Sequence, residues 1–291
     1  MHPAPSVIVF TSLSGLGFGL MAWLGFGFPD VSGATAFWFF FIAYALSVGG
    51  LISSVFHLGT PLNALKSFRQ WRSSWLSREG IMAIASLLVM AVYAIGLIFF
   101  EQRWQIFGWI GALLSLIAIY TTSMIYGQMK TVPRWRMSLT PVLFLLYALA
   151  GGALLSAQVL AAALLLVALT VIQYLAWQIG DGRFEADRHT IETATGLGHL
   201  GKVRLLESPH SSPNYLMKEM VYVVGRKHAQ KLRLISIVLL GVVPAVILVL
   251  VPFSHMFVGL AVLSHIVGLF MTRWLFFAEA EHVVGLYYDK R

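Results

Sequence analysis

The chain has 291 residues, of which 58% are hydrophobic and only 11% are charged. Because a soluble domain carries about 25% charged residues, this apolar surplus excludes a single water-soluble core and indicates a protein that lies in the lipid bilayer. The absence of cysteine excludes internal disulfides and cysteine-ligated iron–sulfur clusters. The net charge of +8 lies in short loops between apolar runs, where membrane topology explains it better than nucleic-acid binding.

Apolar runs long enough to cross a membrane follow one another along the chain. About 20 apolar residues span the hydrocarbon core. The first run, 7–28, is too long for a signal-peptide core and no Lys or Arg precedes it, so we expect a retained first helix. The fold class predicted is all-α, a polytopic membrane protein of eight transmembrane helices in one integral membrane domain, 1–291. The further helices are predicted over 34–56, 80–100, 104–126, 139–156, 159–177, 234–253 and 256–277.

The stretch 139–178 is unusual because it contains 40 residues without a charge. As a single helix it would be about 60 Å long, which is twice the hydrocarbon thickness. The sequence therefore predicts two helices here, with a break near Ser156, Ala157 and Gln158.

Lysine and arginine gather in four segments, 57–78, 127–138, 178–233 and 278–291, which together hold 18 of the 20 such residues. With eight helices, all four segments fall on one side of the membrane. The two remaining cations are Arg103, in a loop of the other side, and Arg273, within the last helix. The positive-inside rule then places the loaded side and both termini in the cytoplasm, as in a multi-pass protein of the inner membrane.

The end of the second predicted helix carries side chains suited to quinone chemistry. His57 lies where this helix leaves the membrane, and a histidine there can donate a hydrogen bond to a quinone carbonyl and exchange a proton near neutral pH. Gly59 would let a flat ring approach the backbone. Glu79, where the third helix begins, could pass the proton on. The structural alternative is an interfacial anchor at a helix end, followed by a proline turn.

The long segment 178–233 mixes both charge signs with Gly, Pro and His, and it is too short for a core of its own. We expect it to be a cytoplasmic docking segment for a soluble partner. A disordered linker is the alternative.

His265 is the one histidine near the middle of a predicted span, and ionisable groups at that depth are candidates for function. It could bind haem iron, hydrogen-bond a quinone or hold a neighbouring helix. Haem b usually needs two axial ligands and no second histidine stands at matched depth, so we favour a quinone or interhelical role. Arg273 follows two turns later on the same face. A haem propionate, a quinone or Glu279 could be its partner, with snorkelling as the alternative. We predict no metal site.

Nearly the whole chain resembles the membrane-anchor subunit family of dimethyl sulfoxide reductase. The resemblance rests on the eight apolar runs and on the motifs HLGTP at 57–61, LSRE at 76–79 and TVP at 131–133 followed by TP at 140–141. It implies a molybdopterin catalytic subunit, an iron–sulfur subunit and this quinone-reactive anchor, so molybdopterin and clusters are expected only on partners. The ligand implied is ubiquinone or menaquinone. His57 and Gly59 match the family's quinol-site motif, whereas Asn63 stands near a position that is often basic.

The predicted orientation in the membrane indicates which branch of this family the chain resembles. The anchor of dimethyl sulfoxide reductase holds its soluble subunits on the outer face, whereas the charge distribution here predicts the inner face. This orientation and the long segment after the sixth helix resemble the branch of the membrane-bound sulfite-oxidising enzyme. Electrons would then pass from sulfite, oxidised by a partner and not by this chain, to quinone. The alternatives are a quinol-oxidising reductase anchor, a transporter and a stand-alone haem protein. Candidate docking residues are Arg134, Trp135, Glu192, His210 and Tyr215.

Overall fold

The computed structural model describes residues 2–56, 66, 68–207, 210, 212, 214–221 and 228–288. Within these residues all regular structure is helical, and no strand is present. The all-α prediction is therefore confirmed. His57 and Gly59, two of the three residues expected at the quinone site, lie outside the described residues.

In the part of the chain that the structure describes, seven helices are long and apolar enough to span a membrane. An eighth apolar helix, α6 Leu139–Leu155, has 17 residues and is about 26 Å long, close to the hydrocarbon thickness. The polytopic architecture is confirmed, and each apolar run of the sequence has its helix. The seven are α1 Pro5–Gly25, α2 Gly33–Val55, α4 Trp75–Phe99, α5 Gln105–Gly127, α7 Val159–Asp181, the continuous Ala229–Leu250 and α12 His255–Ala278. The stretch Ala229–Leu250 comprises α10 Ala229–Ile237, the π-helical η6 Val238–Val242 and α11 Val243–Leu250.

The 40-residue apolar stretch is divided where the sequence predicts. α6 ends at Leu155 and α7 begins at Val159. Between them Ala157 adopts a positive φ of 54°, and Gln158 N donates to Ala153 O at 2.9 Å. The chain thus reverses direction without a proline or glycine, because the backbone groups of the turn find partners within it.

The predicted helix boundaries are wrong by four or five residues at three ends. α4 begins at Trp75, before the predicted start at 80, α7 runs on to Asp181 and α10 begins at Ala229, before the predicted start at 234. The additional turns carry charged side chains such as Arg233. A charge ends an apolar run, but it does not end a helix, whose backbone hydrogen bonds continue into the interface.

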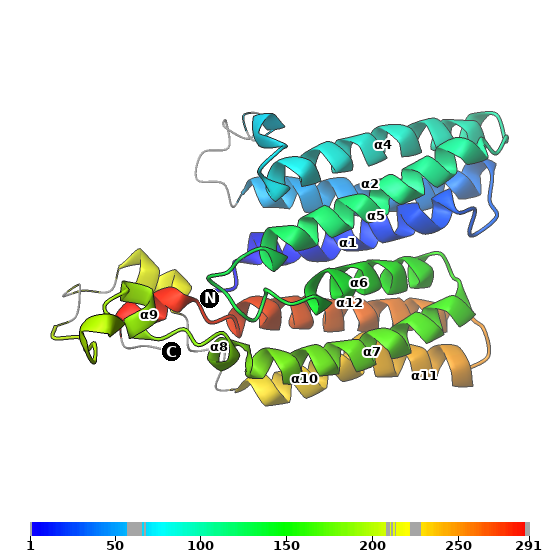
Figure 1. Cartoon of the computed structure of the whole chain (residues 1–291). Coiled ribbons are helices and arrows are strands. Elements are labelled where there is room, and N and C mark those ends of the chain that lie inside the picture. Colours follow the sequence, from blue (N-terminus) through cyan, green and yellow to red (C-terminus); the bar gives the residue numbers. More distant parts are fainter. Residues whose placement is uncertain are drawn as a thin grey trace.

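The membrane helices form two halves that lie side by side in Figure 1. The first half contains α1, α2, α4 and α5, with closest contacts between α4 and α5 and between α1 and α2. The second half contains α6, α7, α10, α11 and α12, in which α6 packs on α7 and α11 on α12. α1 also contacts α6 and α12, and therefore joins the halves.

Small residues let α1 and α6 approach closely at this junction. A Cβ added to Gly19 would lie 1.9 Å from Ala148 O, and one added to Gly152 would lie 2.4 Å from the carbonyl carbon of Gly19. Trp23 Nε1 donates to Leu149 O at 2.9 Å. Helices in a bilayer associate through such packing and hydrogen bonds, because lipid tails solvate apolar side chains as well as another helix does.

The alternation of helix directions brings the described parts of all four basic segments to one end of the molecule, called here the basic end. In Figure 1 the two chain termini and the starts of α4, α6 and α10 lie at this end. The opposite end carries the loops after α1 and α4, where Arg103 forms an ion pair with Asp30.

Beyond the basic end, the segment between α7 and α10 packs with the C-terminal η7 Val283–Tyr288. Tyr287 Oη donates to Ala194 O at 2.7 Å, and Asn214 Nδ2 donates to Tyr288 Oη at 3.2 Å. Val283 N donates to Thr131 O at 3.0 Å. The described part of the segment is therefore tied to η7, and the residue at which η7 begins is tied in turn to the α5–α6 loop. Its short helices are α8 Arg183–Ala186, α9 Ile191–Thr195, η3 Gly198–Leu200 and the π-helical η4 Leu216–Met220.

Candidate functional site

Glu79 lies near the start of α4 at the basic end, with its side chain buried against α5. The helix is capped by Ser74, whose Oγ accepts from Ser77 N at 3.4 Å. Glu79 is 5% exposed, and Thr122 Oγ1 donates to its Oε1 at 2.6 Å. Within the described part of the chain no cation pairs with this carboxyl group. An ionisable group that is buried in a membrane helix without a counter-charge is a candidate for proton chemistry.

The described part of the 57–78 segment folds back onto the start of α4. The ring of Phe68 lies against Gly80, where an added Cβ would be 2.7 Å from Phe68 Cε1. Arg78 Nε donates to Trp71 O at 2.9 Å. Residues 68–78, which follow the HLGTP motif in the sequence, thus contact α4 next to Glu79.

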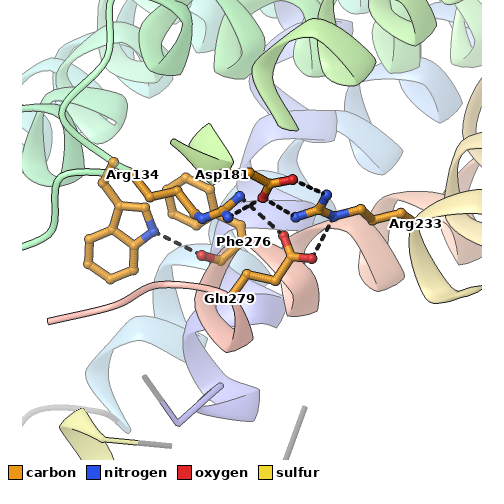
Figure 2. Close-up of polar contacts among 6 residues, drawn as sticks. Arg134, Asp181, Arg233, Phe276 and Glu279 are labelled. Atoms are coloured by element: carbon orange, nitrogen blue, oxygen red, sulfur yellow. Dashed lines mark hydrogen bonds and ion pairs between the residues drawn. The ribbon is translucent and has the colours of Figure 1, made fainter. Parts of the chain in front are cut away.

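Four charged side chains form an ion-pair ring at the basic end of the second half, shown in Figure 2. They are Arg134 of the α5–α6 loop, Asp181 of α7, Arg233 of α10 and Glu279 at the end of α12. Arg233 reaches both acids, at 2.6 and 2.8 Å from the two Asp181 oxygens and 2.7 Å from Glu279 Oε1. Arg134 pairs with Asp181 and lies 3.5 Å from Glu279 Oε2. Two cations and two anions make the ring charge-balanced, and it ties four elements together.

The side chain of Trp135 points inward, although the sequence placed it among the docking residues. It is 2% exposed, stacks on Phe276 at a centroid distance of 5.2 Å and donates through Nε1 to Phe276 O at 2.9 Å. Arg134, next to it, is committed to the ion-pair ring (Figure 2). The structure therefore places both residues where they hold the α5–α6 loop on α12, and the Trp135 side chain is out of a partner's reach.

Glu192, His210 and Tyr215 all lie outside the membrane helices, as the docking prediction requires. Tyr215 is 58% exposed, and the ring of His210 stacks on Tyr288 at 6.0 Å. The backbone N–H of Glu192 and the side chain of Thr190 hold the pKa of the Glu192 carboxyl below its ordinary value. These three residues belong to the segment that packs with the C-terminus.

His265 is buried in the second half and joins three helices. Its Nδ1 donates to Leu240 O at 2.7 Å. Its Nε2 is buried without a hydrogen-bond partner among the described residues, and an added Cβ on Gly151 would lie 3.2 Å from it and 2.2 Å from Leu16 Cδ2. Gly151 of α6 and Leu16 of α1 therefore pack close together beside this face of the imidazole. Of the roles considered for His265, the geometry favours contact between helices over haem ligation.

Arg273 is also buried, at 3% exposure, but it lies apart from the ion-pair ring. Its Cζ lies 3.8 Å from the ring centroid of Phe144 and 4.4 Å from that of Tyr147. Glu279, which the sequence suggested as a partner, forms its ion pairs with Arg134 and Arg233 instead. Cation–π contacts are therefore the described interactions of this guanidinium.

Sequence reasoning missed three members of these sites. Asp181 and Arg233 lie just outside the predicted spans 159–177 and 234–253, so the sequence placed them in the loop between those spans. Thr122 lies inside an apolar run, where a hydroxyl group alone gives no signal of its partner. Glu279 was noticed, but its partners come from positions 134 and 233, which no sequence spacing connects.

Comparison with known proteins identifies the family. The model of the "DMSO reductase anchor subunit (DmsC)" family matches residues 3–278. The chain belongs to this family. It is 29% identical over an alignment of 332 positions to a sulfite dehydrogenase subunit of Allochromatium vinosum, and the alignment covers 99% of both chains. It is 30% identical over 134 residues to the "Anaerobic dimethyl sulfoxide reductase chain YnfH" of Escherichia coli, covering 42% of this chain and 44% of that one. No solved structure matches.

The resemblance inferred from the motifs is thereby confirmed. The DmsC-family chain is a multi-pass membrane anchor subunit of the kind that serves dimethyl sulfoxide reductase-type and sulfite dehydrogenase-type oxidoreductase complexes. Its function therefore lies in a larger assembly, which agrees with the absence of cysteine ligands for clusters in this chain.

Proposed function

We propose that this anchor passes electrons from sulfite oxidation, carried out by cytoplasmic partner subunits, to quinone in the inner membrane. The observation that carries the proposal is the buried carboxyl group of Glu79 at the basic end, in contact with Thr122 and next to Gly80, against which Phe68 packs. The relative that aligns over 99% of the chain is a sulfite dehydrogenase subunit, which supports this branch.

The orientation supports cytoplasmic partners. The basic end carries the described parts of the four segments that, in the sequence, hold 18 of the 20 lysines and arginines. The positive-inside rule places such an end in the cytoplasm. Sulfite oxidised there by a molybdopterin subunit would react with one water molecule and yield sulfate, two electrons and two protons. The electrons would reach this end through the clusters of an iron–sulfur subunit.

The chemistry assigned to this chain is quinone reduction at the first half. A quinone that takes up two electrons also takes up two protons to become a quinol. His57 and Gly59 would hold the headgroup, with His57 donating a hydrogen bond to one carbonyl. Glu79 would hold one of the protons and release it as charge builds on the ring, and Thr122 would fix the orientation of its carboxyl group.

The test compares two electron acceptors in the His57→Ala variant of the assembled complex. We expect sulfite oxidation with a soluble dye to be unchanged, and oxidation with a quinone analogue to fall by about 100-fold, as for loss of a proton-transfer group. His255→Ala, a histidine change at the opposite end, is the matched control. Equal losses with dye and quinone analogue would contradict a quinone role for His57.

We also propose that the segment between α7 and α10 docks the iron–sulfur subunit. Leu200 and Leu206 are 76% and 87% exposed, although the segment lies beyond the ends of the membrane helices (Figure 1). Large apolar side chains that are exposed outside the bilayer are typical of a protein interface. Lys202 and Arg204 lie between them in the sequence and give this surface a positive rim.

Two point changes test docking without deleting a segment that also holds the C-terminus. Leu200→Asp and Leu206→Asp should release the soluble subunits from isolated membranes, while the anchor itself stays in place. Glu101→Gln, an exposed position at the opposite end, should release nothing. Full retention of the subunits in both Leu variants would refute the docking surface.

The second candidate is a quinol-oxidising anchor of a dimethyl sulfoxide reductase-type enzyme. The similarity to a dimethyl sulfoxide reductase chain over 134 residues favours it. In that case electrons would flow from quinol to the partners, and the basic end would face the periplasm. Membrane orientation separates the two candidates.

A further inference from the structure

A small cavity lies inside the second half at the basic end, between α6, α7 and α12. Phe144, Tyr147 and Phe276 form apolar walls, and Gln173 and Arg273 contribute polar groups. Arg134 and Glu279 of the ion-pair ring line it as well, so the ring lies at the basic-end side of the cavity. The space accommodates only a few water-sized molecules.

Arg273 brings an uncompensated positive charge to this cavity. Only 3% of the residue is exposed, and its Nε has no hydrogen-bond partner among the described residues. The aromatic faces of Phe144 and Tyr147 lie 3.8 and 4.4 Å from Cζ and attract the cation only partly. A buried guanidinium is strongly destabilising unless an anion or several acceptors satisfy its donors.

The neighbouring acidic side chains are not free to supply the negative charge that would compensate Arg273. Asp181 and Glu279 are each shared between Arg134 and Arg233, so two carboxylates neutralise two guanidinium groups. The ion-pair ring is therefore neutral as a unit. Arg273, the remaining cation of the cavity lining, leaves the site with a net charge of +1 from the described residues.

A second donor faces the same space. Tyr147 Oη donates to Gln173 Oε1, which fixes the amide and leaves its NH₂ group as a donor. Gln173 is 5% exposed and lines the cavity together with Arg273. A guanidinium and an amide on α12 and α7 are suited to a charged acceptor between them.

We propose that this cavity binds one small monovalent anion, such as chloride or formate, through the Arg273 guanidinium and the Gln173 amide. The size of the cavity favours this class over a quinone ring, and the net charge favours an anion over water alone. The site is separate from the quinone site proposed at Glu79, since it belongs to the other half of the molecule. The bound anion would hold the basic ends of α6, α7 and α12 together.

Thermal unfolding of the purified anchor complex in matched salts tests the proposal. At equal ionic strength, replacing gluconate by chloride or formate should raise Tm by several degrees, because a ligand that binds only the folded state stabilises it. In Arg273→Met the rise should vanish. In gluconate this variant should unfold no earlier than the wild type, because the uncompensated charge has been removed. Arg69→Met, an exposed cation of the first half, should respond to chloride as the wild type does.

A conservative variant covers the case in which Arg273→Met does not assemble. Arg273→Lys keeps the charge but loses the planar fork of donors, so half-saturation should require about a tenfold higher chloride concentration, the effect of one lost hydrogen bond of about 1.4 kcal/mol. A chloride response that is absent in the wild type, or unchanged in either Arg273 variant, would overturn the proposal. So would stabilisation through Arg273 by a quinone analogue in place of chloride.

Discussion

The two halves of the molecule place their buried acidic side chains in opposite ways at the same end of the membrane. In the first half Glu79 is buried with a hydroxyl partner and no described counter-charge. In the second half four charged residues neutralise one another in a closed ring (Figure 2). A self-neutralising ring stabilises an arrangement of helices, whereas an isolated carboxyl group is available to take up and release a proton. The comparison therefore supports the proposal that proton chemistry belongs to the first half, and it favours a structural role for the ring.

The largest effect is expected where the halves meet. Gly19→Val would place a Cβ 1.9 Å from Ala148 O, a backbone atom that cannot turn away. The loss of stability should exceed the about 1–3 kcal/mol that overpacking usually costs, and little folded chain should remain in membranes. Gly15→Val, on the same helix with nothing within 4 Å of the added Cβ, is the control. Equal accumulation of both variants, measured by size-exclusion chromatography in detergent, would show that the junction is not close-packed.

Breaking the ion-pair ring should give the next largest loss of stability. Glu279→Gln leaves Arg134 and Arg233 with Asp181 as their carboxylate, so we expect a loss of about 3 kcal/mol, the lower part of the range for a broken buried pair. Thermal unfolding measures it, with Glu101→Gln as the control at the opposite end. The ratio of quinone to dye activity should stay at the wild-type value. A selective loss of quinone activity would move the redox chemistry to the second half.

The same contrast explains how far sequence alone could go. The apolar runs and the break after Ser156 were predictable because the hydrocarbon thickness sets both. The ion-pair ring was not, since positions 134, 181, 233 and 279 are brought together only by the packing of α7, α10 and α12. The start of α10 was missed for a related reason. The apolar run begins only after Arg233, whereas the helix already begins at Ala229.

A substitution of Glu79 tests the first half of the molecule, where the buried carboxyl group is proposed to exchange a proton. Glu79→Gln keeps an acceptor for Thr122 Oγ1 but removes the exchangeable proton. Stability should therefore change by less than about 1 kcal/mol, whereas quinone reduction should fall by about 100-fold. Dye-coupled sulfite oxidation and quinone-coupled oxidation measure the split. A loss of stability without a change in the quinone-to-dye ratio would make Glu79 a structural residue like those of the ring.

The smallest effect is expected at the hydroxyl partner. Thr122→Val removes the hydrogen bond to Glu79 and keeps the shape of the side chain. Because the proton-exchanging group remains and loses only its orientation, quinone reduction should fall by a few-fold, the effect of a net hydrogen bond of about 1 kcal/mol. Thr121→Val, whose hydroxyl bonds only to backbone carbonyls of its own helix, is the matched control. An identical response of the two variants would remove Thr122 from the site.

Membrane orientation is the most direct test of the proposed function, because that function requires electrons to arrive at the end that carries Glu79. The chain has no cysteine, so a single introduced thiol reports one position. With a membrane-impermeant maleimide on spheroplasts, the Gln102→Cys variant should be labelled directly and the Ser73→Cys variant, at an exposed position of the basic end, only after lysis. The reverse pattern would place the basic end in the periplasm, and would contradict electron delivery from cytoplasmic sulfite.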